Sequence, residues 1–250
     1  MIDPRSASFG RRADAYDQAR PPYPGAAIEL IVEALDLGPS ARVVDLAAGT
    51  GKLTGALAAR FAGVTAVEPS DGMRARLHRS LPEVETLPGT AESIPLPDRS
   101  VDALFVAEAF HWFDRERAVA EIGRVLVSGG GLALLSNRER WKPEPNPWLQ
   151  RFGELIAPLL ETDPHPSERG SWTAELEAIG GLEPVSRAEV DHVHRLDPDG
   201  FVELISTWSF VANLPEAERT PLLAEIAAVV GDRATIELDY TTELLWTRKR

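Results

Sequence analysis

The chain has 250 residues, a formal net charge of −13 and no cysteine. This length favours one large α/β domain with a buried core, here taken to span residues 1–250, and the acidic balance argues against nucleic acid as a partner. The lack of cysteine excludes disulfides and thiolate metal sites, and since no apolar run of about 18 residues and no signal-peptide core occur, we expect a cytoplasmic chain that does not enter a membrane.

The N-terminal segment contains Tyr16-Asp17, Arg20-Pro21 and Tyr23-Pro24. We expect a short helical stretch, ended by the prolines, ahead of the core. Apolar residues at helical spacing then predict an amphipathic helix that stops at Gly38-Pro39. These residues are Ala27, Leu30, Ile31, Ala34 and Leu35.

The next stretch predicts a strand, a glycine turn and the start of a helix. Arg42 to Leu46 is a short buried strand, Ala48 to Gly51 is a small-residue turn, and apolar residues from Leu53 onward mark a helix face. Glycines let the backbone adopt conformations closed to other residues and let a ligand approach closely. The polar end of that ligand would face the free N–H groups of the helix start.

The spacing of this turn separates two kinds of nucleotide site. A P-loop is rejected because Leu46 stands where its first glycine belongs and Leu53 where its hydroxyl belongs. A dinucleotide fingerprint stays open, although Thr54 occupies the position of its third glycine.

A second acidic residue follows at the end of the next predicted strand, residues 64–68. Glu68 comes 23 residues after Asp45 (68 − 45), close to the spacing at which an acid binds ribose hydroxyls. This acid indicates a ribose and does not choose the cofactor. Ser70 is a plausible N-cap of the helix that carries Met73.

The following segments predict two more strands, each leading to a polar loop. Residues 83–87 lead to the loop 89–98, which begins Gly89-Thr90-Ala91-Glu92. Val101 to Ala107 is a nearly continuous apolar run, typical of a central parallel strand buried on both faces. Its carboxyl end, where open α/β sheets bind ligands, carries the cluster 108–114.

The rest of the chain alternates predicted helices and strands. A helix through Ala118 and Val125 is expected to end at the turn 128–131, before a fifth strand at Leu132 to Leu135. Helices are expected at 149–160, 172–179 and 201–230, the last interrupted at Pro215, and alternating patterns at 185–196 and 236–246 predict two late strands.

Four ordered motifs together resemble class I S-adenosylmethionine-dependent methyltransferases. They are the turn Asp45 to Gly51, with Ala47 at the family's usual first glycine; the loop 89–95, with Thr90 at the family's usual Asp; the cluster 108–114; and the run 124–130. The N-terminal Tyr-Asp-x-x-Arg-Pro-x-Tyr-Pro pattern is similar to small-molecule enzymes of the trans-aconitate and ubiquinone-biosynthesis types.

The resemblance implies an α/β fold with a Rossmann-like seven-stranded sheet of order 3-2-1-4-5-7-6, strand 7 antiparallel, helices on both faces and a helical lid. It implies that residues 1–25 cover the cofactor, that 26–137 form the cofactor-binding core, and that 138–183 and 197–232 are substrate-side insertions. The chain is expected to act as a monomer or a homodimer.

The resemblance also implies S-adenosylmethionine as cofactor and a small-molecule methyl acceptor, with O-methylation of a carboxylate or hydroxyl favoured. The expected cofactor residues are Tyr16, Arg20 (on the methionine carboxylate), Asp45, Ala47, Gly49, Gly51, Glu68, Met73, Thr90, Ala91, Glu92, Ala107 and Glu108. The expected substrate pocket comprises His111, Trp112, Trp141, Trp208 and Phe210.

Alternatives remain for the chemistry. His111 is a candidate general base because its ordinary pKa near 6.5 suits proton removal, but the favoured interpretation is a structural histidine beside Trp112. His192 and His194 project to one side of a strand, yet no further ligand is evident, so no metal is expected. An NAD-dependent oxidoreductase and a non-catalytic cofactor-binding module are the rival functions.

Overall fold

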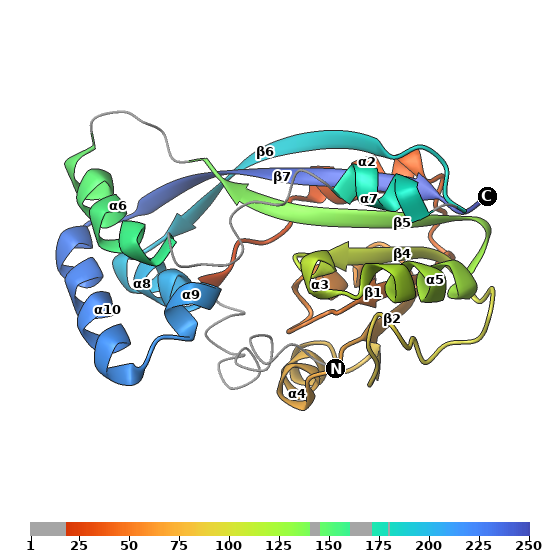
Figure 1. Ribbon diagram of the computed structural model, residues 1–250, viewed down its shortest axis with the longest axis horizontal. Helices are drawn as coiled ribbons and strands as arrows, with labels where there is room; N and C mark the ends of the chain where they lie inside the picture. Colours follow the sequence, from red (N-terminus) through yellow and green to blue (C-terminus); the bar gives the residue numbers. More distant parts are fainter. Residues whose placement is uncertain (1–18, 141–145, 161–171, 180) are drawn as a thin grey trace.

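The computed structural model describes residues 19–140, 146–160, 172–179 and 181–250, and its centre is a seven-stranded sheet with helices on both faces (Figure 1). The strands are β1 (Arg42–Leu46), β2 (Gly63–Val67), β3 (Glu85–Leu87), β4 (Val101–Ala107), β5 (Leu126–Glu139), β6 (Ser186–Leu196) and β7 (Ile236–Arg248).

The strand order is β3-β2-β1-β4-β5-β7-β6, which confirms the predicted order. β1 to β5 pair in parallel, and β7 runs antiparallel to both of its neighbours, β5 and β6. The apolar runs of β1 and β4 have the predicted bounds because central parallel strands, buried on both faces, leave the clearest sequence signal.

Alternate residues of the central strands pack into two separate cores. On one face, Val43 and Phe105 pack with α2 (Gly25–Ala34) and α3 (Lys52–Ala58). On the other face, Val44 and Leu104 pack with α5 (Arg115–Val125). The sheet therefore has a helix layer on each side, as the period-2 alternation of strand side chains requires.

β5 differs from the prediction, which placed a glycine turn before a strand at 132–135. The strand begins directly after α5, and its register against β4 shifts between Leu126, opposite Val101, and Gly131, opposite Ala103. The glycine run therefore lies inside the strand as an irregularity. Gly131 lies so close to α2 that an added Cβ would come within 2.5 Å of Leu35 Cδ1, which explains why this position has no side chain.

The carboxyl end of β5 and the adjoining ends of β6 and β7 extend beyond the rest of the sheet and carry a group of helices (Figure 1). We call this group the helical cap; it comprises α6 (Pro147–Leu160), α8 (Pro198–Ser206), α9 (Ser209–Ala212) and α10 (Glu216–Val230). The cap has its own core, in which Phe152, Phe201 and Trp208 pack with Ile236 and Tyr240 of β7. The predicted break at Pro215 is the N-cap of α10.

The predicted insertion 138–183 divides between the two halves of the molecule. α6 joins the helical cap, but α7 (Trp172–Ile179) packs on the sheet, where Trp172 and Leu176 are buried with Phe110. The other helices are α4 (Asp71–Ser80), which Ser70 caps as predicted, and the short 3₁₀ helix η2 (Phe110–Trp112). Within the described ranges, none of the helices has the length and apolar composition needed to cross a membrane.

We expect Gly131→Ala to lower the free energy of unfolding by about 1–3 kcal/mol, because its Cβ would overpack the buried Leu35. Gly123→Ala is the matched control: Gly123 lies in α5, nothing lies within 4 Å of an added Cβ, and alanine should stabilise the helix by about 0.5–1 kcal/mol. Urea unfolding of both variants measures the difference. Equal stability of the two variants would contradict this account of β5.

Candidate functional site

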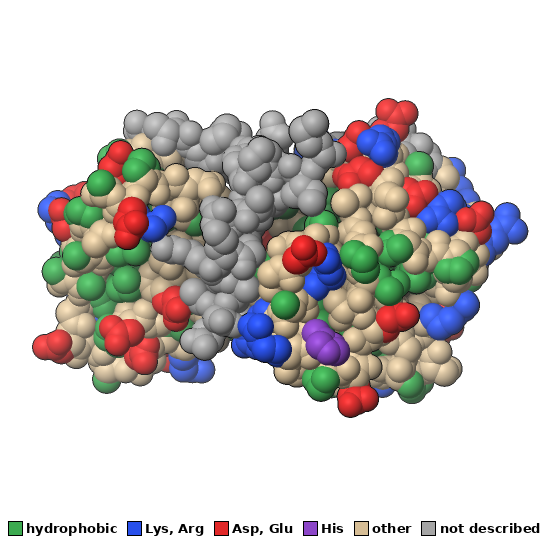
Figure 2. Space-filling view, turned by 90° about the horizontal axis from the view of Figure 1, so that it is seen from below, with side chains coloured by type: hydrophobic (Ala, Val, Ile, Leu, Met, Phe, Trp, Pro, Cys, Tyr) green, Lys and Arg blue, Asp and Glu red, His purple; other side chains and the backbone are tan. Residues whose placement is uncertain are grey.

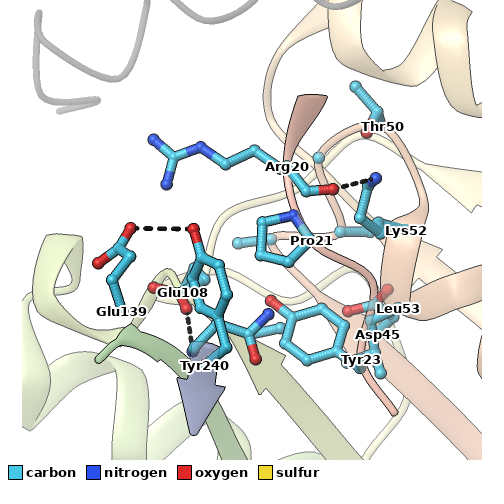
Figure 3. A pocket seen from close by; sticks show the side chains of 15 residues that line it. Arg20, Pro21, Tyr23, Asp45, Thr50, Lys52, Leu53, Glu108, Glu139 and Tyr240 are labelled. Atoms are coloured by element: carbon cyan, nitrogen blue, oxygen red, sulfur yellow. Dashed lines mark hydrogen bonds between the residues drawn. The ribbon is translucent and has the colours of Figure 1, made fainter. Parts of the chain in front are cut away.

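A pocket lies at the carboxyl ends of β1 and β4, which are neighbours in the sheet (Figure 3). Because α3 follows β1 on one face and α5 follows β4 on the other, the chain opens a crevice between the two strand ends. The empty space of the pocket is about 600 Å³, its open mouth included. It is lined by Arg20, Pro21, Tyr23, Asp45, Ala47, Ala48, Gly49, Thr50, Lys52, Leu53, Ala107, Glu108, Asn137, Glu139 and Tyr240.

The loop after β1 has backbone angles that favour glycine. The φ angles of Ala47, Gly49 and Gly51 are 59°, 59° and 91°. A Cβ added at Gly49 would meet nothing within 4 Å, whereas one at Gly51 would lie 2.7 Å from Leu77 Cγ. Gly49 therefore leaves room for a ligand against the backbone, as the cofactor interpretation requires, while Gly51 is needed for packing against α4.

Glu68, directly after β2, joins two loops. Its Oε2 accepts a hydrogen bond from the backbone N–H of Gly49 (3.0 Å), and its Oε1 accepts one from Ser70 (2.8 Å). The carboxyl is buried, and burial raises its pKa although these hydrogen bonds oppose the rise. Each carboxylate oxygen has two lone pairs, so Glu68 can still accept ribose hydroxyls while it shapes the glycine loop.

Asp45 lies near the end of β1 and is almost completely buried. The hydroxyl of Thr54 in α3 donates a hydrogen bond of 2.6 Å to its Oδ2. Burial raises the pKa of Asp45 to about 7, and the hydrogen bond from Thr54 acts in the opposite direction. The carboxyl is therefore partly protonated at neutral pH, so it can donate as well as accept a hydrogen bond in the pocket.

The segment at Ala19 and Arg20 connects the glycine loop with the helical cap. Lys52 Nζ donates to the backbone oxygen of Arg20 (2.7 Å), and a ring nitrogen of His194 lies 2.9 Å from the backbone oxygen of Ala19. The Arg20 guanidinium donates from Nε to Thr207 Oγ1 and from Nη2 to the Thr207 carbonyl, each at 3.0 Å. Arg20 lines the pocket as predicted, and its pairing with the methionine carboxylate stays a prediction.

The far end of the pocket is built from β4, β5 and β7. Glu108 follows β4 with a φ of 55°, and its Oε1 accepts a hydrogen bond from the backbone N–H of Asn137. The phenol of Tyr240 donates to Oε1 of Glu139 at 3.3 Å (Figure 3). Tyr240 is buried, and burial together with the charge of Glu139 raises the pKa of its phenol.

Several predicted cofactor residues, Gly51 and Glu68 among them, lie beside the described lining of the pocket rather than in it. Met73 is buried in α4, and Ala91 is buried in the core on the α5 face. Thr90 bridges to Ser93 within its own loop. Glu92 accepts a hydrogen bond from the backbone N–H of Asp114, which places Glu92 at the loop that precedes α5. Their contacts with a cofactor stay predictions.

The predicted substrate aromatics are divided between two clusters. The His111 ring lies 4.7 Å from Trp112 and stacks on Trp172 at 6.4 Å, measured between ring centroids. Trp208 and Phe210 lie 5.4 Å apart in the helical cap. Neither cluster contributes to the described pocket lining. Two further predicted residues, Tyr16 and Trp141, lie outside the described residues.

His192 and His194 serve structural contacts. His192 stacks on Tyr240, with ring centroids 5.6 Å apart, and its Nε2 lies 3.3 Å from Asn137 Oδ1. Burial lowers the pKa of both histidines. Over the described ranges, no group of three or more metal-ligating side chains occurs.

The sequence interpretation missed the polar residues at the far end, namely Asn137, Glu139 and Tyr240. Asn137 and Glu139 follow the apolar part of β5, and Tyr240 belongs to an alternating pattern that indicated only a half-buried strand. The register of β5 against β7 pairs Glu139 with Tyr240. Period-2 spacing placed 137 and 139 on one face, so only the strand pairing was needed to find this group.

The chain is similar to known proteins over almost its whole length. A family model described as a methyltransferase domain matches residues 44–134. An uncharacterized methyltransferase of Mycobacterium tuberculosis is 37% identical over 229 residues, which cover 90% of this chain and 86% of the relative. The malonyl-[acyl-carrier protein] O-methyltransferase of Methylococcus capsulatus is 39% identical over 134 residues, which cover 51% of this chain and 49% of the relative.

A solved structure extends the similarity to the helical cap. The structure of a candidate type II methyltransferase from Anaeromyxobacter dehalogenans has a TM-score of 0.66 and 28% sequence identity. The similar region covers 92% of this chain and 97% of the solved chain. The cap is therefore included in the shared architecture.

The raised pKa of Asp45 predicts a pH-dependent stability. Because the folded state binds this proton more tightly than the unfolded chain, with a pKa of about 7 against 3.8, the contribution is complete below about pH 4 and is lost as pH rises to 7. We expect Asp45→Asn to remove this loss, so that at pH 8 the variant is more stable than the wild type by on the order of 2–4 kcal/mol.

Urea unfolding between pH 4 and 8 measures this effect. Asp232→Asn, at an exposed position after α10, is the control for removal of one negative charge. An unchanged slope of stability against pH in Asp45→Asn would contradict the assignment.

Proposed function

Because the chain belongs to the class I S-adenosylmethionine-dependent methyltransferase family, we propose that it transfers a methyl group to an oxygen of a small molecule. Dependence on S-adenosylmethionine follows from the family. The small-molecule acceptor and the transfer to oxygen are the proposal. The observation that carries it is a single pocket that runs from the glycine loop at Gly49 to the polar pair Glu139 and Tyr240.

The residues at the β1 and β2 end suit the adenosyl part of the cofactor. Gly49 gives access to the backbone, and Glu68 has the lone pairs to hold the ribose hydroxyls. Ala107 and Glu108, at the end of β4, would lie at the methionine part. When bound, S-adenosylmethionine supplies a methyl group activated by a sulfonium, so the main task of these residues is positioning.

The far end of the pocket supports an acceptor rather than a cofactor-binding module without a second substrate. Glu139 and Tyr240 lie on β5 and β7, on the side of β1 opposite to β2 and Glu68. A protein that binds only the cofactor would not need polar side chains from β5 and β7 in the pocket, whereas an acceptor would use them as hydrogen-bonding partners. The name of the Methylococcus capsulatus relative, an O-methyltransferase, agrees with transfer to oxygen.

The surface charge supports a small molecule rather than a nucleic acid. The net charge is −13, and on the face that Figure 2 shows, Lys and Arg side chains are interspersed with Asp and Glu. Binding to a phosphate backbone requires clustered basic residues.

We expect S-adenosylhomocysteine to bind and NAD not to bind in calorimetric titrations. Glu68→Gln should weaken S-adenosylhomocysteine binding by roughly tenfold or more, because hydrogen bonds to a charged group are each worth about 1.5–3 kcal/mol. Since Glu68 also holds Gly49 and Ser70, the variant should have a lower Tm as well. Gly131→Ala is the control, because it is expected to lower stability at a position of β5 that faces Leu35 and does not line the pocket.

Tight binding of NAD without binding of S-adenosylhomocysteine would reject the proposed function. If Gly131→Ala weakened binding as much as Glu68→Gln, the loss would reflect instability and Glu68 would be removed from the ribose site.

A test of His111 separates catalysis from packing. A general base contributes about 10²–10⁴-fold to turnover. Since the ring of His111 packs between Trp112 and Trp172, we expect His111→Gln to lower the Tm and to change turnover by less than about tenfold. His78→Gln, at an exposed position of α4, is the matched control. A loss of 10²-fold or more at unchanged Tm and cofactor affinity would instead establish the predicted catalytic role.

A further inference from the structure

Glu139 is an acid of the pocket with an open hydrogen-bonding position. Its carboxylate lines the pocket and accepts one hydrogen bond, at Oε1, from Tyr240. Among the described residues, no other donor reaches this carboxylate. The second oxygen can therefore accept a hydrogen bond from a ligand, and the Tyr240 oxygen, which donates its proton to Glu139, keeps lone pairs of its own.

The position of Glu139 separates it from the adenosyl end of the pocket. The sheet order places β2, with Glu68, on one side of β1, and places β4, β5 and β7 in succession on the other side. Glu139 ends β5 and pairs with Tyr240 of β7. A ribose held by Glu68 leaves this end of the pocket to the second substrate.

The charges of this end favour a hydrogen-bond donor. Glu108 and Glu139 both line it, and like charges repel an ionised carboxylic acid. Arg20 also lines the pocket, and its charge opposes the rise in the pKa of Tyr240, but it directs two of its donors to Thr207 in the helical cap. The ammonium of Lys52 lies on the Arg20 carbonyl (Figure 3).

We propose that Glu139 and Tyr240 form the acceptor subsite, and that the acceptor carries an O–H or N–H group whose proton passes to Glu139. This inference rests on the proposed function. Among oxygen acceptors it selects hydroxyls over carboxylates, because an ionised carboxylate has no proton to give to Glu139, and it adds amines as acceptors of the same proton-transfer chemistry. Glu139 acts as a catalytic residue, while Tyr240 is a positioning residue that fixes the orientation of the carboxylate.

The chemistry balances without any further reactant. The bond between the methyl carbon and the donor sulfur breaks, and its electron pair stays on sulfur as a thioether. A lone pair of the acceptor oxygen or nitrogen forms the new bond to carbon, and the proton of the acceptor moves to a Glu139 oxygen and from there to solvent. The sulfonium charge and the Glu139 charge are thereby both neutralised.

Glu139→Gln keeps the shape of the side chain and removes its capacity to take a proton. We expect affinity for S-adenosylhomocysteine, measured by calorimetry, to stay within about twofold of the wild type. Methyl transfer to the best acceptor should fall by roughly 10²–10⁴-fold. Tyr240→Phe should lower turnover about tenfold, with the same retained affinity. Glu237→Gln, which removes an exposed charge from β7, is the control.

The acceptor class is tested with labelled S-adenosylmethionine and a panel of small alcohols, phenols and amines, each paired with the carboxylic acid of the same carbon skeleton. We expect labelling only among the hydroxyl and amine members. The same pairs titrated into the protein loaded with S-adenosylhomocysteine should bind with the same preference, and Glu139→Gln should reduce that preference.

The outcomes separate this inference from the function on which it rests. Labelling confined to carboxylic acids overturns the acceptor assignment but leaves the proposed function standing, because a methyl group still reaches an oxygen. Labelling of no compound, with S-adenosylhomocysteine bound, overturns both and favours a non-catalytic cofactor-binding module. A tenfold loss of S-adenosylhomocysteine affinity in Glu139→Gln would place Glu139 at the cofactor and also overturn the assignment. If neither S-adenosylhomocysteine nor S-adenosylmethionine binds the wild type, the proposed function itself fails.

Discussion

The ligand site depends first on the carboxylate of Glu68, which holds the loop after β1 to the loop after β2. Its two oxygens accept the backbone N–H groups of Gly49 and Ser70, and Ser70 in turn caps α4. A buried carboxylate without such donors would cost several kcal/mol. The same two hydrogen bonds therefore offset the free-energy cost of burying the acid. They also fix the glycine loop in a conformation that lets a ligand reach the backbone of the loop.

The positions of the central strands were predictable because each carries a strong local signal, whereas their order in the sheet was predicted from the resemblance to the methyltransferase family. Arg42–Leu46 and Val101–Ala107 are apolar runs flanked by turns, and the structure gives them the predicted bounds. The extent of β5 was not predictable from residues 126–139 alone. Its glycines predict a turn. In the structure, however, Gly131 packs on Leu35, and the backbone N–H of Gly129 donates a hydrogen bond to the carbonyl of Lys249, and both partners are distant in sequence. A run of glycines shows that side chains are absent, but it does not predict which distant residues occupy the space beside the backbone.

The part of the site at β1 and β2 was predictable from the sequence, and the part at β5 and β7 was not. Asp45, Gly49 and Glu68 follow one another at fixed spacing in neighbouring strands, so sequence distance approximates distance in space. Glu139 and Tyr240 are brought together by an antiparallel pairing across 101 residues. Arg20 lines the pocket, and its guanidinium also donates to Thr207 across 187 residues, while its predicted contact with the cofactor stays a prediction. Contacts of such range depend on the register of the last strands, which no local pattern encodes.

The extension of β5 and β7 past the rest of the sheet has a consequence for how such a protein evolves. The ends of β1 and β4 line the pocket with residues between Asp45 and Glu108, whereas β5 and β7 line it with residues from Asn137 onward. Substitutions in the second stretch can accumulate after gene duplication without disturbing the first. A lineage that keeps the first stretch intact can therefore change what the second stretch binds by drift and selection within residues 137–250, a little under half of the chain.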